Sequence, residues 1–180
     1  MNWKSEGHRY GAVAMAMHWA TAGALLFLLG SGLLMERLAD DMTRLQVLRA
    51  HVAVGALVLL LTLTRIGWWL FADRRPSEPA GMPRWQAKTS NLVHRLSYAA
   101  ILIMGASGFA MLVLSGVVPI LIAGQPDALP DFQLYPPRAA HGLVAWVLIA
   151  LIAVHVAAAL YHQFVLRDRL LARMGIGQAG

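Results

Sequence analysis

The chain has 180 residues, of which 58% are hydrophobic and only 13% are charged, and its formal net charge is +6. A soluble domain carries about 25% charged residues, so this composition indicates a protein that lies mostly within a bilayer. It excludes a soluble enzyme, a nucleic-acid-binding domain and a disordered tail. The absence of cysteine excludes disulfides, thiolate zinc sites, iron–sulfur clusters and covalent attachment of a cofactor through cysteine.

Four long stretches of the chain are almost free of charge. They cover residues 10–35, 50–72, 96–126 and 139–166, and Arg65 is the only charged residue inside them. About 20 apolar residues span the hydrocarbon layer as a helix, and backbone groups in lipid must be satisfied within the segment. We therefore predict an all-α integral membrane protein, a single domain over residues 1–180. Its four-helix up-down bundle has helices at about 11–35, 50–72, 91–116 and 139–166.

The basic residues near the helix ends predict the orientation of the bundle. One side of the membrane collects Lys4, Arg9, Arg74, Arg75, Arg84, Lys88, Arg95, Arg167, Arg169 and Arg173. The other side has only Arg37, Arg44, Arg49 and Arg138, together with five acidic residues. Because cytoplasmic loops carry the excess of Lys and Arg, we expect both termini to be cytoplasmic.

Most of the histidines belong to the predicted helices. Those within the helices or at their edges are His18, His51, His94, His141, His155 and His162. Ionisable side chains inside a membrane are costly and are usually functional. Any one of these histidines, taken alone, is equally well explained as a structural residue that bonds a neighbouring helix.

The spacing of four histidines predicts two pairs across the bundle. His141 and His155 lie 14 residues apart, which places them on one helix face about 21 Å apart along the axis. His51 begins the second helix at the outer depth of His141, and His18 begins the first helix at the inner depth of His155. The expected pairs are therefore His51 with His141 and His18 with His155.

Two facing imidazoles at each of two depths are the ligand pattern of two bis-histidine b-type haems. A porphyrin against a helix also needs small neighbours within about a turn of its ligand, and these are Ala14, Ala22, Gly55, Ala145, Ala158 and Ala159. A zinc site would need three or four converging ligands. A proton relay would be expected to include carboxylates, and the predicted spans contain none. Scattered structural histidines are the remaining alternative.

Short motifs around these histidines resemble the small bacterial cytochrome b561 proteins, in particular those of the superoxide oxidase type. The matching strings are Met17-His18-Trp19, Arg49-Ala50-His51-Val52 with Gly55, Asn91-Leu92-Val93-His94-Arg95-Leu96-Ser97-Tyr98, Ala140-His141-Gly142 and His155-Val156-Ala157-Ala158-Ala159-Leu160-Tyr161-His162. The similarity covers essentially the whole chain. Each string is short, and the specificity comes from the ordered set.

The resemblance implies that His18 and His155 bind the iron of an inner haem b, and that His51 and His141 bind that of an outer one. It also implies a ubiquinone pocket near the inner haem, to which His94 and His162 contribute. The sequence adds two observations in support. His94 has the polar residues Ser90, Ser97 and Tyr98 on its face, and His162 follows His155 by about two helical turns.

Arginines on the outer side are candidates for attracting superoxide, which is an anion. Arg44, Arg49 and Arg138 lie near the outer histidines in sequence, and a cationic entrance speeds the encounter with an anion. Pairing with haem propionates is the alternative role for Arg49 and Arg138. Arg65, inside the second helix, is expected to hold an inner propionate or to extend to the inner surface.

The resulting prediction is a multi-pass protein of the bacterial inner membrane that transfers electrons from superoxide, through two haems b, to ubiquinone. The first alternative is an electron-relay subunit between a dehydrogenase and the quinone pool, without superoxide chemistry of its own. The second alternative is a structural or sensory membrane protein without a cofactor. No nucleic-acid partner is expected.

Overall fold

Four long helices make up the bundle in the computed structural model, which describes residues 2–7, 9–78, 81–168 and 170–177. They are α1 (Ala12–Met35), α2 (Asp41–Gly67), α3 (Arg84–Ser115) and α5 (Pro137–Tyr161). Each is long and apolar enough to cross a membrane. No β-strand occurs in the described part of the chain. The predicted all-α membrane fold with four spanning helices is therefore confirmed.

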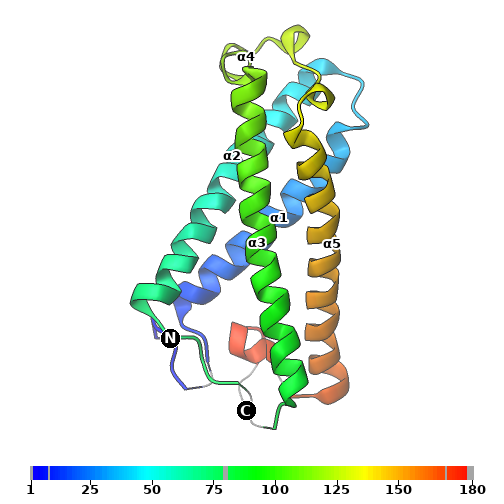
Figure 1. The fold of residues 1–180 in the computed structure, drawn as a ribbon. Helices are drawn as coiled ribbons and strands as arrows, with labels where there is room; N and C mark the ends of the chain where they lie inside the picture. The colour runs from blue at the N-terminus through cyan, green and yellow to red at the C-terminus, as the bar shows by residue number, and fades with distance from the viewer. Residues whose placement is uncertain (1, 8, 79–80, 169, 178–180) are drawn as a thin grey trace.

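The two ends of the bundle differ in what they contain (Figure 1). Both chain termini lie at one end, which we call the terminal end. There, α2 and α5 each continue into a single π-helical turn, at Trp68–Ala72 and His162–Leu166. The opposite end, which we call the loop end, holds the link from α1 to α2 and the short helix α4 (Val117–Ala123).

The helix boundaries correct several of the predicted ones. Helix α2 begins at Asp41 rather than near residue 50, α3 begins at Arg84 rather than near residue 91, and α4 was not predicted. The carboxylate of Asp40 accepts a hydrogen bond from the backbone N–H of Thr43 at 2.7 Å and so caps α2. The uncharged windows underestimate the length of such helices, because a helix can continue beyond the hydrocarbon layer, where its residues carry polar side chains.

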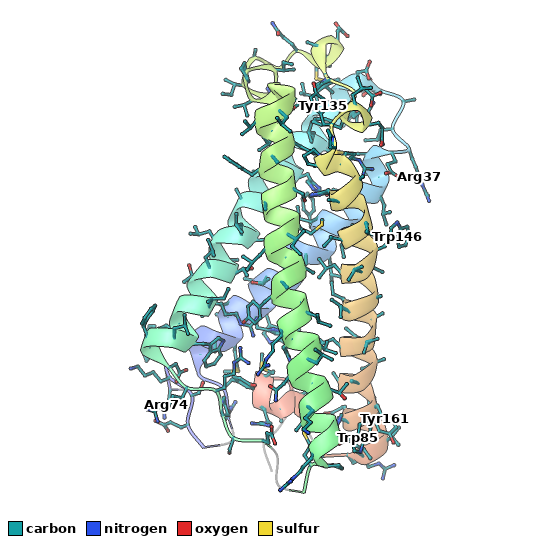
Figure 2. The ribbon with its side chains drawn as sticks, in the orientation of Figure 1. Arg37, Arg74, Trp85, Tyr135, Trp146 and Tyr161 are labelled. Carbon is teal, nitrogen blue, oxygen red and sulfur yellow. The ribbon has the colours of Figure 1, made fainter. Side chains whose placement is uncertain are left out.

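Packing is tightest along two helix pairs, α3 with α5 and α1 with α2, while α2 diverges from α3 toward the terminal end (Figure 1). The buried centre consists of Val58, Ala100, Ile101 and Leu148. A second buried cluster, of Leu45, Val117 and Leu121, holds α4 on the loop end. Large apolar side chains such as Phe109 and Trp146 point outward and are exposed, as expected of a surface that faces lipid (Figure 2).

Asp73 fastens the N-terminal segment to the terminal end of α2. Its Oδ2 accepts hydrogen bonds from the backbone N–H of Ser5 at 3.0 Å, from the Ser5 hydroxyl at 2.8 Å and from the Trp68 indole at 3.2 Å. Partial burial alone would raise the pKa of Asp73, but the hydrogen bonds from Ser5, Arg74 and Trp68 outweigh it and lower the pKa.

Replacing Asp73 with alanine should release the N-terminal segment without unfolding the bundle. Amide hydrogen exchange of residues 2–7 should become about tenfold faster, in line with about 1.5 kcal/mol for one hydrogen bond to a charged group. Because the folded state lowers the pKa of Asp73, the anchor is complete above the ordinary carboxyl pKa and is lost as the pH falls through the lowered value. Exchange that is unchanged in the variant at neutral pH would contradict this role.

Candidate functional site

His51 on α2 and His141 on α5 face each other near the loop end of the bundle. Their ring centroids lie 6.3 Å apart, and the ring planes are inclined by 57°. The hydroxyl of Ser31, on α1, lies 2.9 Å from Nδ1 of His51. The hydroxyl of Ser107, on α3, lies 3.0 Å from Nδ1 of His141. All four spanning helices therefore contribute a side chain to this site.

His18 on α1 and His155 on α5 form a second pair nearer the terminal end. Their ring centroids lie 6.2 Å apart, and the planes are inclined by 62°. Arg65 of α2 reaches this pair, because its Nη1 lies 3.3 Å from Nδ1 of His18. Its guanidinium also lies 5.8 Å from the ring centroid of Tyr98. The structure thus brings together both of the pairs that were predicted from spacing.

His94 of α3 is a third histidine at the terminal-end pair. Its ring centroid lies 5.2 Å from that of His155, in an edge-to-face contact. Its Nδ1 donates a hydrogen bond to the backbone carbonyl of Ser90 at 2.7 Å, while the Ser90 hydroxyl lies 3.5 Å away. This bond leaves Nε2 of His94 available to another partner.

His162, which follows α5, is engaged differently. Its Nδ1 forms an ion pair with the carboxylate of Asp168, and its ring contacts Tyr161, with 6.2 Å between the centroids. The ring contacts found in the described residues include none between His162 and His94. Asp168 was not singled out from the sequence, and the pairing arises because the chain turns back after the π-helical turn.

The spacing within each pair matches two imidazoles bound to one metal ion from opposite sides. Two metal–nitrogen bonds of about 2 Å each, and about 1 Å from each coordinating nitrogen to its ring centre, place the centres about 6 Å apart. The observed 6.2 Å and 6.3 Å agree with this. The 5.2 Å between His94 and His155 is too short for it, so His18 is the better partner of His155.

The surroundings of the pairs favour a haem over an isolated metal ion. No three His, Cys, Asp or Glu side chains converge on one point in the described part of the chain, whereas zinc takes three or four such ligands. A methyl group added at the half-buried Gly55 would meet no atom within 4 Å, which leaves room beside His51. The buried Nε of Arg65 has no hydrogen-bond partner, and a haem propionate is an acceptor of the required charge.

The glycines next to the two serines bring the helices close to the histidine rings. A Cβ added at Gly32 would lie 3.7 Å from His51, and one added at Gly108 would lie 3.5 Å from His141. Sequence analysis missed Ser31 and Ser107. The available signal was the Ser-Gly dipeptide that occurs once on α1 and once on α3. In each case the serine supplies a hydroxyl, and the adjacent glycine lets the helix backbone lie close to the histidine ring.

Two of the three outer arginines predicted from sequence are bonded to other parts of the chain. The Nε of Arg49 donates to the carbonyl of Leu121 at 2.6 Å, so this side chain caps the end of α4. Arg138 pairs with Glu36 at 2.6 Å. Arg44 is exposed, and its side chain has no hydrogen bond or ion pair within the described residues.

A sequence profile for prokaryotic cytochrome b561 matches residues 9–177 of this chain. The chain belongs to the prokaryotic cytochrome b561 family. One relative, cytochrome b562 of Cereibacter sphaeroides, is 35% identical over 173 residues, which are 92% of this chain and 94% of the relative. Cytochrome b561 homolog 2 of Escherichia coli K12 is 26% identical, over 97% of this chain and 95% of its own length. Homolog 1 from the same organism is 27% identical, over 93% of this chain and 97% of its own length.

Family membership makes this chain a membrane electron-transfer protein that binds haem b. The donor set described above is consistent with that cofactor, because it offers imidazoles in opposed pairs and no thiolate.

Proposed function

We propose that this protein is a superoxide oxidase of the bacterial inner membrane, which takes electrons from superoxide and reduces ubiquinone. It would hold one haem b between His51 and His141 and another between His18 and His155. The observation that supports this proposal is the centroid spacing of 6.3 Å and 6.2 Å in two pairs at different depths. The excess of Lys and Arg around the terminal end supports a cytoplasmic position for both termini.

Haem, when bound, supplies one-electron redox chemistry, which the protein positions and tunes. The four imidazoles would hold the two irons and would so set the two depths between which electrons cross the bilayer. Arg65 provides a buried positive charge beside the His18–His155 pair. The apolar side chains of the bundle centre exclude water between the two levels.

The loop end is the proposed entry side for superoxide, and Arg44 is the one of the three predicted arginines whose exposed side chain has no hydrogen bond or ion pair within the described residues. Arg49 and Arg138 are held by backbone carbonyls and by Glu36, which leaves them a structural role. We expect Arg44→Gln to slow haem reduction by superoxide about two- to threefold at low salt, with the difference vanishing at high salt. Arg37→Gln, an exposed arginine at the same end (Figure 2), tests whether the effect is specific to Arg44. Equal rates for Arg44→Gln and the unmodified protein at low salt would exclude this role.

The terminal end is the proposed site of ubiquinone, near His94, Ser90 and His162. Ubiquinone needs two protons as well as two electrons to become the quinol. A His94 ring protonated on both nitrogens can donate one of them from Nε2 while Nδ1 keeps its bond to Ser90, and the His162–Asp168 pair can donate the other.

Replacing His94 or His162 with alanine should leave the haem content unchanged and slow quinone reduction about 10- to 100-fold, since each variant removes a proton donor. The rates are measured with a soluble ubiquinone analogue after rapid reduction of the protein. Unchanged quinone kinetics in both variants would remove these residues from the pocket.

An electron-relay subunit that takes electrons from a dehydrogenase is the second candidate. The structural engagement of Arg49 and Arg138 favours it, because it weakens the cationic entrance that superoxide would use. Stopped-flow mixing of the purified, oxidised protein with superoxide separates the two functions. Fast reduction of the haem absorbance by superoxide alone, abolished by superoxide dismutase, supports the oxidase, whereas no reduction supports the relay subunit.

A further inference from the structure

Ser31 and Ser107 occupy equivalent places around the loop-end histidine pair. Both serines are buried, with 7% and 8% of their surface exposed. Ser31 lies 2.9 Å from Nδ1 of His51, and Ser107 lies 3.0 Å from Nδ1 of His141. The same contact therefore occurs twice, from two different helices, on the two rings of one pair.

The direction of these hydrogen bonds follows from the single proton of a hydroxyl group. Each serine donates that proton to the carbonyl three residues earlier in its own helix, Ser31 to Leu28 and Ser107 to Met104, both at 3.1 Å. The hydroxyl oxygen can then only accept from the histidine. The imidazoles of His51 and His141 are thus held with the proton on Nδ1, which leaves the lone pair of each ring on Nε2.

The His18–His155 pair has no such arrangement. The group next to Nδ1 of His18 is the guanidinium of Arg65, which can only donate hydrogen bonds. No serine or threonine hydroxyl contacts either ring within the described residues. Buried hydroxyls that bond their own helix also occur away from histidines, as in Thr21 with the carbonyl of Met17 at 2.7 Å. Contact with an imidazole, and not the helix bond, therefore distinguishes Ser31 and Ser107.

We propose that Ser31 and Ser107 are positioning residues that fix the tautomer of His51 and His141 and lower the midpoint potential of the haem they would hold. An N–H donated to an acceptor makes the imidazole a more basic ligand, and a more basic ligand stabilises the oxidised iron. The inference rests on the proposed haem site at this pair. Because, within the described residues, these serine–histidine hydrogen bonds occur at the loop-end pair and not at the His18–His155 pair, they would lower the midpoint potential of the loop-end haem and leave that of the other haem unchanged.

The test is potentiometric titration of the haem-loaded, full-length protein and its variants. In Ser31→Ala, one of the two midpoint potentials should rise by about 59 mV, a tenfold change in the one-electron equilibrium, while the other stays in place. The Met104 carbonyl also lies within hydrogen-bonding reach of His141, so Ser107→Ala should produce a smaller rise. Ser31→Thr, which keeps the hydroxyl, should restore most of the original potential.

Thr21→Val is the matched control, because it removes a buried hydroxyl from the same helix as Ser31 without touching a histidine. It should leave the loop-end potential unchanged. Equal potentials in Ser31→Ala and the parent protein, or equal shifts in Ser31→Ala and Thr21→Val, would overturn the inference while the haem site stands. A parent protein without a low-spin bis-histidine spectrum would overturn the proposed haem site and this inference together.

Discussion

Replacing His141 with alanine is expected to remove one of two haems per chain and to leave the other in place. The ring of His141 lies 6.3 Å from that of His51 and contacts no other histidine ring in the described residues, so a haem held there would lose one of its two axial ligands. A haem held by His18 and His155 would not depend on this residue. The measurement is the ratio of haem to protein in the purified variant, together with its reduced-minus-oxidised spectrum.

His94→Ala is the informative comparison for the pairing. His94 contacts His155 at 5.2 Å between centroids, and His18 contacts it at 6.2 Å. If the distance between ring centroids decides which histidine binds the iron together with His155, His18→Ala should lose one haem and His94→Ala should keep both. Loss of haem in His94→Ala with retention in His18→Ala would show that His155 pairs with His94. Loss of both haems in His141→Ala would show that the two sites assemble cooperatively.

Replacing Arg65 with glutamine is expected to lower the midpoint potential of the haem at His18 and His155 by about 59 mV, a tenfold change in a one-electron equilibrium. A positive charge beside a redox centre favours the reduced state, since reduction adds one negative charge. Arg65 is the only charged side chain within the four nearly uncharged stretches of the sequence, and its buried Nε has no partner within the described residues. The loss of this charge should therefore be felt strongly in a medium of low dielectric constant.

Two further variants test whether the buried charge of Arg65 causes the change in midpoint potential: Arg65→Lys keeps the charge, and Arg75→Gln removes an exposed charge. Lysine keeps the charge and should restore most of the potential, although it cannot make a bidentate contact with a propionate. Arg75 lies over Trp69 at the terminal end and is exposed, so its charge is screened by solvent. A potential that is unchanged in Arg65→Gln, or lowered equally in Arg75→Gln, would show that the buried arginine does not tune the site.

The effects of the serines and of Arg65 on the two haem potentials favour the same direction of electron transfer. The serines would lower the potential at the loop end, and Arg65 would raise it at the terminal end. Electrons move toward the higher potential, so this difference would favour transfer from the loop end to the terminal end. That direction is the one required for superoxide oxidation on one side of the membrane and quinone reduction on the other.

Charge pattern and helical spacing were enough to predict the four membrane helices and the two histidine ring contacts, His51 with His141 and His18 with His155, that the structure shows. Charge-free windows and helical spacing are properties of the chain and of the bilayer thickness, so residues such as His141 and His155 could be placed without a structure. Helix ends were less predictable. Helix α2 begins at Asp41, within a charged segment, because its cap at Asp40 and its polar first turn lie outside the hydrocarbon layer.

Only the tertiary structure decided which polar side chains serve those histidines. Ser31 and Ser107 come from α1 and α3, far in sequence from the rings that they contact, and hydrogen bonds between helices depend on their rotation and depth. For the same reason, sequence could not foresee that Arg49 caps α4 and that Arg138 pairs with Glu36. Spacing along one helix fixes the face and depth of its own residues, whereas a contact across the bundle also depends on how the neighbouring helix packs.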